Sequence, residues 1–103
     1  MTNNQRMYAI AFDLDTTLLK KHYNENYNNA YTEIKSFLEA EGFERQQGSV
    51  YFGNKDRVNA VSCVMSAAKL SKTFPWFAPC VKDIRMLRIE EANDLKPAVA
   101  SVL

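Results

Sequence analysis

Closely spaced carboxylates near the start of the chain are the first residues that could do chemistry. The segment FDLDTT at residues 12–17 places Asp13 and Asp15 on either side of one leucine. A carboxylate can bind a hard divalent cation such as Mg²⁺, which prefers oxygen ligands and keeps several waters. It can also take up a proton as a general base. Both kinds of chemistry remain open for Asp13.

A second polar group lies in the segment KDIRMLR at residues 82–88. In an extended strand, residues two apart share a face, so Asp83 and Arg85 are predicted on one side and Arg88 on the other. An arginine can bind phosphate through two parallel N–H groups. An Asp–Arg pair that stabilises an interface is a competing interpretation for these two residues.

Histidine and cysteine are too scarce for several kinds of site. His22 is the only histidine, so a two-histidine acid and base pair cannot form within one chain. We expect it in a polar loop, outside the site. Cys63 and Cys80 lack the paired spacing of zinc ligands and are expected to be free thiols.

The segment MYAIAFDLD at residues 7–15 must position the first aspartate. Its bulky apolar residues alternate with smaller or polar ones, which predicts a strand with two different faces. We expect the bulky side to meet the helices, and Asp13 and Asp15 to lie on the other side with Ala9 and Ala11. The bulky residues are Tyr8, Ile10, Phe12 and Leu14.

Apolar residues recur at three- and four-residue spacing in two later segments, which predicts helices at residues 24–41 and from an N-cap at Asn54 to about Thr73. The aromatic residues of the following FPWFAPC loop are interpreted as a lid on the core rather than a base-stacking surface. They are Phe74, Trp76 and Phe77.

Three further strands complete the expected architecture. Residues 43–46 and 49–52 are predicted as a hairpin with a tight turn at Gln47 and Gly48, and residues 81–89 as the last strand. The resulting order is βαββαβ, the α+β pattern of the ferredoxin-like fold, with a four-stranded antiparallel sheet and helices on one face only.

Length and composition limit the chain to one small domain. It has 103 residues, a net charge of +1 and a hydrophobic fraction of 47%. We predict a domain at residues 7–94, a flexible N-terminal extension at 1–6 and a C-terminal tail at 95–103. No apolar run suits a membrane span or a signal peptide, so a cytoplasmic protein is expected. Small residues on the uncovered sheet face would let a second copy approach, which favours a homodimer.

Three blocks of sequence, MYAIAFDLDT, GFERQQGSVYFG and WFAPCVKDIRMLRIEE, resemble the virulence-associated protein D (VapD) family of small bacterial proteins. The resemblance runs from Met7 to about Asp94, with the blocks in order and at similar spacing. It implies a ferredoxin-like homodimer related to the small CRISPR adaptation nucleases. It also implies endoribonuclease activity, usually as the toxin of a toxin–antitoxin pair, so RNA and a small antitoxin protein are the expected partners.

The family pattern carries an aspartate at the position of Asp13. Asp13 would bind Mg²⁺ between protein and phosphate, or take the proton from a ribose 2′-hydroxyl while cations stabilise the charge on phosphorus. A capping role in a turn competes with both. No cofactor is therefore certain, and Mg²⁺ is one possibility. Asp15 is interpreted as a turn residue.

The remaining site residues are assigned to catalysis or substrate binding. Ser49 is expected on the same strand face as Tyr51, where its hydroxyl would contact phosphate or orient Asp13, and a simple turn serine is an equal alternative. The predicted catalytic set is Asp13, Ser49 and Asp83, and the predicted substrate-binding set is Arg45, Tyr51 and Arg85. A basic track of Lys20, Lys21, Arg45 and Lys82 could extend this surface, although most such side chains are simply solvated.

Two other functions compete with RNA cleavage. FDLDTTL also resembles the first motif of the haloacid-dehalogenase-like phosphotransferases, with Asp13 as nucleophile and Asp15 as acid and base. That chemistry needs further strands of a doubly wound parallel sheet, for which the chain after Asp15 is too short. A non-catalytic dimeric module that binds a partner is the third hypothesis, because a fold does not establish a function.

Overall fold

The computed structural model describes residues 7–101, so the predicted extension at 1–6 and the end of the tail at 102–103 lie outside the described residues. The described elements follow each other in this order: β1 (Met7–Leu14), α1 (Thr16–His22), α2 (Asn28–Ala40), β2 (Phe43–Gln47), β3 (Val50–Gly53), α3 (Ala60–Thr73), α4 (Phe77–Cys80), β4 (Val81–Ile89) and α5 (Lys96–Ala100). The four strands form one antiparallel sheet in the order β2-β3-β1-β4, as the βαββαβ pattern predicts.

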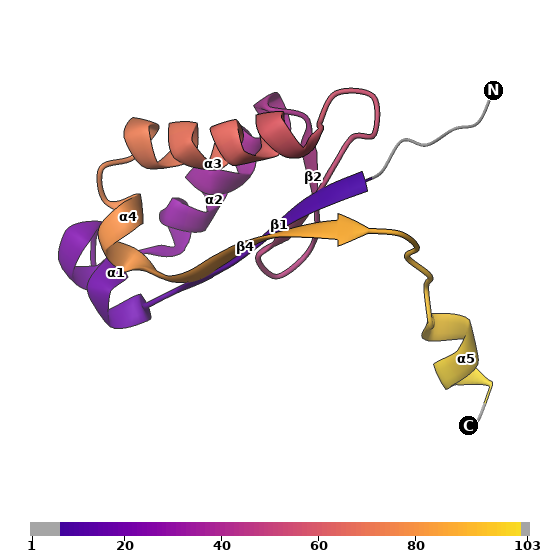
Figure 1. Ribbon diagram of the computed structural model, residues 1–103. Helices are drawn as coiled ribbons and strands as arrows, with labels where there is room; N and C mark the ends of the chain where they lie inside the picture. Colours follow the sequence, from indigo (N-terminus) through magenta and orange to yellow (C-terminus); the bar gives the residue numbers. More distant parts are fainter. Residues whose placement is uncertain (1–6, 102–103) are drawn as a thin grey trace.

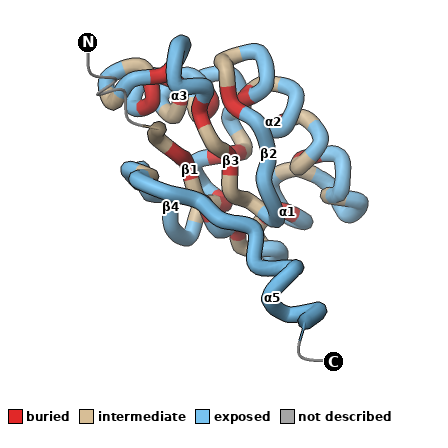
Figure 2. Tube along the Cα trace, turned by 90° about the vertical axis from the view of Figure 1, so that its right-hand side faces the viewer, coloured by how far each residue is buried: buried red, intermediate tan, exposed pale blue. Residues whose placement is uncertain are grey.

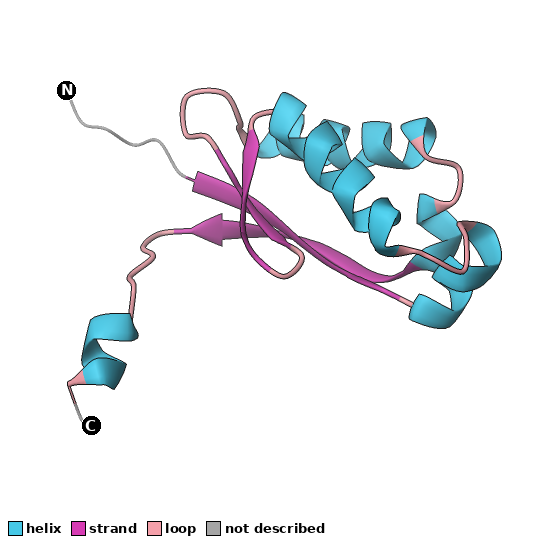
Figure 3. Cartoon of the chain, turned by 180° about the vertical axis from the view of Figure 1, so that it is seen from behind, coloured by secondary structure: helices cyan, strands magenta, loops and turns pink. Residues whose placement is uncertain are grey.

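Helices α2 and α3 cover one face of this sheet, and within residues 7–101 only the short C-terminal segment approaches the other face (Figures 1 and 3). The core lies between them. The bulky side of β1 faces the helices, where Ile10, Phe12 and Leu14 are buried. They pack with buried residues of the helices such as Ile34 and Leu38. The predicted helix-facing side of β1 is therefore confirmed for these three residues. On the other side, Ala9 is fully buried, contrary to the expected open face, and Asp15 lies beyond the strand, which ends at Leu14.

The first helical segment differs from the prediction of one helix at 24–41. The predicted helix corresponds to α2, which begins only at Asn28, and the unpredicted α1 precedes it at Thr16–His22. The N–H groups of Tyr23 and Asn24 both bond to the carbonyl of Leu19, which ends α1. The Asn24 side chain then accepts a hydrogen bond from the N–H of Asn26 at 2.7 Å, a local turn that separates the helices.

The N-cap of helix α3 lies five residues later than the predicted cap at Asn54. Asn59 is the N-cap: its side chain accepts from the Ser62 N–H at 2.8 Å, and the Ser62 hydroxyl accepts from the Asn59 N–H at 2.9 Å. This reciprocal pair satisfies two N–H groups at the helix start. Asn54 instead holds the preceding loop through the N–H of Asp56. The helix ends at Thr73, as predicted.

Glycines shape the chain before and after β2. Gly42 has a φ of +99° between α2 and β2, and Gly48 has a φ of +52° in the hairpin turn. Residues with a side chain rarely adopt such positive φ angles, so glycine fits both positions. The turn comprises Gly48 and Ser49, one residue later than predicted, and Ser49 therefore precedes β3 rather than belonging to it.

The last strand, β4, forms the edge of the sheet beside β1 and is exposed over most of its length (Figure 2). Beyond it, the tail predicted at 95–103 contains the short helix α5, which stands away from the sheet on the side opposite α2 and α3 (Figure 1). The loop before β4 also contains a short helix, α4, that the sequence interpretation treated as irregular.

Candidate active site and a neighbouring pocket

Asp13 and Asp83 face each other across the pairing of β1 with β4. Their Cα atoms are direct partners in the antiparallel ladder, and the register shifts immediately afterwards. Directly opposed residues project from the same face. Asp13 is exposed and accepts no hydrogen bond from the residues at 7–101. The two carboxylates thus mark one end of the uncovered sheet face.

Arg85 lies on the same face as these carboxylates and pairs in register with Ala11. Its Nε donates to Oδ2 of Asp83 at 2.8 Å, with both side chains largely exposed. The Asp83 carboxylate raises the pKa of the Arg85 guanidinium. Arg88 pairs with Tyr8 on the helix side, as the alternation of the strand predicts. The structure therefore brings Asp13, Asp83 and Arg85 together.

Asp15 has a structural role at the start of α1. It is the N-cap of α1, where its Oδ1 accepts from the Leu18 N–H at 3.0 Å, and its own N–H donates to the Cys80 carbonyl at 2.8 Å. This agrees with its interpretation as a turn residue and leaves it poorly placed as a general acid. Together with the fully antiparallel sheet, it excludes the phosphotransferase hypothesis, which needs a parallel doubly wound sheet.

Two of the other predicted site residues, Tyr51 and Arg45, lie on the opposite side of the sheet. Tyr51 is only 3% exposed, pairs in register with Ile10 and stacks on Phe12 with ring centroids 6.1 Å apart. Arg45 is the partner of Tyr51 on β2, and its Nε donates to the Gly48 carbonyl at 2.8 Å. The chain by itself therefore does not gather all six predicted residues into a single cluster.

Ser49 stands between the two groups. Its carbonyl accepts from the N–H of Phe12 at 3.1 Å, which fixes the hairpin turn beside the residue that precedes Asp13. Ser49 also lines a pocket of about 310 Å³ on the helix side. The remaining lining residues are Phe12, Tyr31, Thr32, Lys35, Arg45, Gly48 and Tyr51. We call this the helix-side pocket.

Sequence reasoning missed Tyr31 and Lys35 as pocket residues. Tyr31 was interpreted only as part of the apolar stripe of a helix, and Lys35 was given no role. Both lie on α2, one turn apart, so they project from the same side of the helix. The sequence shows this spacing. It does not show that this side of α2 packs beside the turn at Ser49.

Several other candidates have structural roles. His22 is the last residue of α1 rather than part of a loop, and it is exposed with Lys20 and Lys21. Trp76 packs edge-on against Tyr23 with ring centroids 4.9 Å apart. Its neighbours Phe74 and Phe77 also join the core, which confirms the lid interpretation. Cys63 and Cys80 are free and buried, and burial raises the pKa of both thiols.

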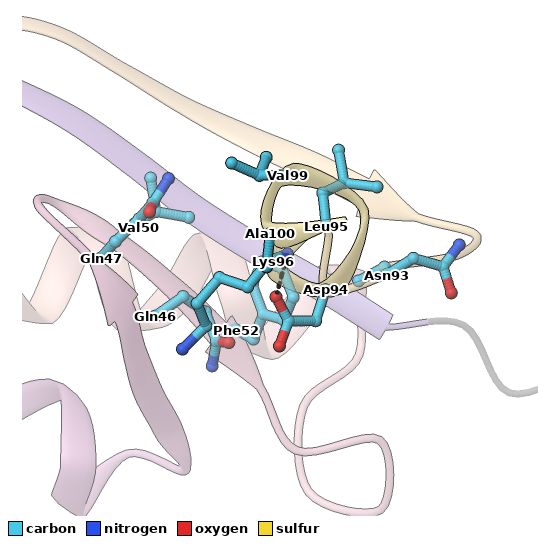
Figure 4. Close-up of a pocket in the computed structure, with 11 residues that line it drawn as sticks. Gln46, Gln47, Val50, Phe52, Asn93, Asp94, Leu95, Lys96, Val99 and Ala100 are labelled. Atoms are coloured by element: carbon cyan, nitrogen blue, oxygen red, sulfur yellow. Dashed lines mark hydrogen bonds between the residues drawn. The ribbon is translucent and has the colours of Figure 1, made fainter. Parts of the chain in front are cut away.

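A larger groove of about 1220 Å³ lies between the hairpin and the C-terminal segment (Figure 4). Val50 and Phe52 line it from β3, while Leu95 and Val99 line it from the segment of α5. Leu95 and Val99 are 68% and 65% exposed. Apolar surface on both walls makes this a region where a protein surface could be buried.

The donor set of the uncovered face suits a hard cation only in part. No group of three or more His, Cys, Asp or Glu side chains within residues 7–101 could hold a metal ion. Mg²⁺, however, commonly uses one or two carboxylates and completes its shell with water and phosphate oxygens. Asp13, which has no competing cation, fits that requirement better than Asp83, which is paired with Arg85. Over the same residues, no helix is long and apolar enough to cross a membrane.

Comparison with known proteins gives consistent relationships. The model of the family described as CRISPR-associated protein Cas2 matches residues 6–96. A Riemerella anatipestifer protein named Endoribonuclease VapD 2 is 54% identical over 95 residues, covering 91% of this chain and all of that protein. A Helicobacter pylori protein named Endoribonuclease VapD homolog is 53% identical over 97 residues, covering 94% of this chain and all of that protein. Endoribonuclease VapD of Dichelobacter nodosus is 48% identical over 93 residues, 90% of this chain and 97% of that protein.

Proposed function

This chain belongs to the VapD family, which is related to Cas2, and we propose that it is an endoribonuclease that cleaves RNA at the Asp13 end of the uncovered sheet face. The observation that carries the proposal is the register of β1 and β4. It puts an exposed carboxylate, Asp13, which has no hydrogen-bond partner among residues 7–101, beside the ion pair of Asp83 and Arg85. One unpaired base and one oriented cation on the same surface suit cleavage of a phosphodiester.

The proposed mechanism begins with proton transfer from a ribose 2′-hydroxyl to the Asp13 carboxylate. The 2′-oxygen then forms a bond to the adjacent phosphorus, and the bond from phosphorus to the 5′-oxygen breaks. The departing 5′-oxygen takes a proton from water, which gives a 2′,3′-cyclic phosphate and a 5′-hydroxyl. Arg85 stabilises the extra negative charge on the phosphate oxygens. Asp83 holds the guanidinium through its Nε and leaves the terminal nitrogens free of partners among the described residues.

Mg²⁺ is a proposed but optional component. Asp13 would hold the ion, with Asp83 nearby. The ion would supply additional positive charge next to the scissile phosphate. Whether or not it is bound, Arg85 orients the phosphate and the Asp83 carboxylate fixes Arg85.

We further propose a homodimer through the uncovered sheet face. Ala9 on β1 is already fully buried, but Ala11 is half-buried and Leu87 on the neighbouring strand remains 40% exposed on this face. A second copy on this face would bury that apolar surface and bring two Asp13 carboxylates toward one interface. The apolar walls of the groove beside α5 would be covered by the same association.

The proposed biological role is the toxin of a bacterial toxin–antitoxin pair that acts in the cytoplasm. Resemblance to the VapD family supports this role, together with the small size of the chain. A small antitoxin protein is the expected partner. The non-catalytic alternative predicts that such a partner binds tightly while the chain cleaves nothing.

The test compares the wild type with Asp13→Asn on three substrates: RNA, the same sequence with 2′-O-methyl groups, and a phosphomonoester, each with Mg²⁺ or with chelator. We expect cleavage of RNA by the wild type and a loss of at least 10²-fold in Asp13→Asn, the usual contribution of a general base. The 2′-O-methyl strand should resist cleavage because it has no 2′-proton to lose.

Circular dichroism and sedimentation of both proteins provide the controls for folding and assembly. Undiminished cleavage by a folded Asp13→Asn protein would refute the site. Cleavage of the 2′-O-methyl strand in Mg²⁺ alone would replace the 2′-hydroxyl route by metal-assisted hydrolysis at Asp13. A folded wild type that binds RNA or a partner without cleaving RNA would favour the binding module.

A further inference from the structure

The helix-side pocket has a chemical character that the Asp13 site does not use. It lies between α2 and the β2–β3 turn, on the face of the sheet opposite Asp13. Its volume of about 310 Å³ is at the lower end of the range for small-molecule sites and leaves room for one compact polar group. Side chains of α2, β2 and β3 converge on it.

Two cations line this pocket, Lys35 from α2 and Arg45 from β2, and none of the lining residues is acidic. Neither cation forms an ion pair within the part of the chain that the structure describes. The Nε of Arg45 donates a hydrogen bond to the Gly48 carbonyl, and this bond orients the guanidinium beside the turn. Two unpaired cations around a concave site attract an anion.

Hydroxyl donors complete the lining. Burial is the main cause that raises the pKa of both Tyr31 and Tyr51, so both phenols stay protonated at neutral pH and can donate hydrogen bonds. Thr32 and Ser49 add aliphatic hydroxyls. Glu39 also acts on Tyr51 through its charge, but it does not line the pocket. Cations and neutral hydroxyls together are the donors that a phosphate group requires.

The pocket adjoins the Asp13 site around the end of the hairpin. Phe12 lines the pocket, and the next residue, Asp13, projects to the other face. The Asp13 charge also contributes to the raised pKa of Tyr31, which places the carboxylate within electrostatic reach of that phenol. A strand of RNA at Asp13 could therefore continue past Ser49 toward Lys35.

We propose that the helix-side pocket is an anion subsite that takes one phosphate group of a nucleotide, with Lys35 and Arg45 as the charged contacts. The inference rests on the proposed function, because the phosphate next to the scissile one is its natural occupant. A free mononucleotide carries the same chemistry and would use the same donors.

The test measures binding without cleavage. A fluorescent 2′-O-methyl oligonucleotide and, separately, adenosine monophosphate are titrated into the wild type and Lys35→Gln. The matched control is Lys72→Gln, which removes an exposed lysine of α3 outside the pocket. Each protein is titrated over a range of salt concentrations.

If the oligonucleotide fills the subsite, Lys35→Gln should lower the slope of log affinity against log salt by about 0.7, which is about fivefold in affinity at 0.1 M salt. Lys72→Gln should match the wild type. If only the mononucleotide weakens in Lys35→Gln, the subsite takes a free nucleotide. Equal affinities of Lys35→Gln and Lys72→Gln for both probes would overturn the proposal.

This outcome is separate from the fate of the proposed function. The probe strand cannot be cleaved through its 2′-position, so a lack of catalysis does not affect the binding curves. Arg45→Gln gives an independent second variant, with circular dichroism to check the turn at Gly48 that Arg45 supports. Asp13→Asn should keep the salt slope of the wild type while it loses cleavage.

Discussion

Replacing Asp15 by alanine separates the two aspartates of the FDLD segment into a structural and a chemical residue. The Asp15 side chain accepts the Leu18 N–H at 3.0 Å at the start of α1. Loss of such a cap costs about 1 kcal/mol, within a range of roughly 0.5–2. For a domain of this size, about 1 kcal/mol lowers the Tm by about 4–8 °C. Helix α1 also carries the fully buried Leu19, so the cap supports a core contact.

Asn is as good an N-cap as Asp, so Asp15→Asn should retain most of this stability and lose only a few tenths of a kcal/mol with the charge. Asp13→Asn, at an exposed position with no partner in residues 7–101, should change the stability by no more than about 0.5 kcal/mol. The assays are thermal unfolding by circular dichroism and RNA cleavage by the same preparations.

We expect the two aspartates to affect different properties, Asp15 the stability and Asp13 the cleavage of RNA. Asp15→Ala is less stable, Asp15→Asn is nearly normal in both assays, and Asp13→Asn is stable but inactive. The reasoning fails if Asp15→Asn loses cleavage as severely as Asp13→Asn, because the second aspartate would then act chemically. It also fails if Asp15→Ala unfolds at the temperature of the wild type.

Two further predictions concern the core and its pH dependence. Leu38 is fully buried on α2, so Leu38→Ala should lower the free energy of unfolding by about 2–5 kcal/mol in urea titrations, with Leu38→Met as the milder control. Lys69 and Ser66 lower the pKa of Glu41, so this carboxylate stabilises the fold above its unfolded pKa of about 4.3, and the contribution is lost as pH falls through the folded value. Glu41→Gln should therefore flatten the pH dependence of stability below about pH 4.3. An unchanged acid limb would count against the Glu41 contacts.

Periodicity predicted the fold where burial is regular along the sequence. Ile34 and Leu38 mark the buried side of α2 at four-residue spacing, and alternation assigned the helix-facing side of β1 correctly. Helix α1 was missed because only Leu19 is buried in it and its other residues form no apolar stripe. Its existence depends on the Asp15 cap and on tertiary contacts, which local pattern does not reveal.

The start of α3 shows a different limit. Asn54 and Asn59 are both good cap residues, and propensity alone does not distinguish them. The reciprocal bonds of Asn59 with Ser62 decide the start, and a serine three residues after the cap was a usable signal.

The candidate site also has one part that the sequence could predict and one part that it could not. Asp13, Asp83 and Arg85 could be grouped from strand alternation, since register follows from the period of two. The helix-side pocket could not be predicted from the sequence, because Lys35 and Arg45 line one pocket only through the packing of α2 beside the hairpin turn.

The exposed edge of β4 gives the protein two opposite responses to salt. Cations recur along this strand at Lys82, Arg85 and Arg88, among apolar side chains that remain partly exposed. Arg85 and Arg88 form exposed ion pairs with Asp83 and Glu90, so the net positive charge of this edge is small. Like charges on an open edge hinder another strand from pairing with it. Salt screens that repulsion, since the Debye length is about 10 Å at 0.1 M, so strand addition at this edge becomes easier as salt rises. The RNA binding proposed at Arg85 should weaken over the same range. Ionic strength would thus favour strand addition at β4 while it suppresses the proposed contact with RNA.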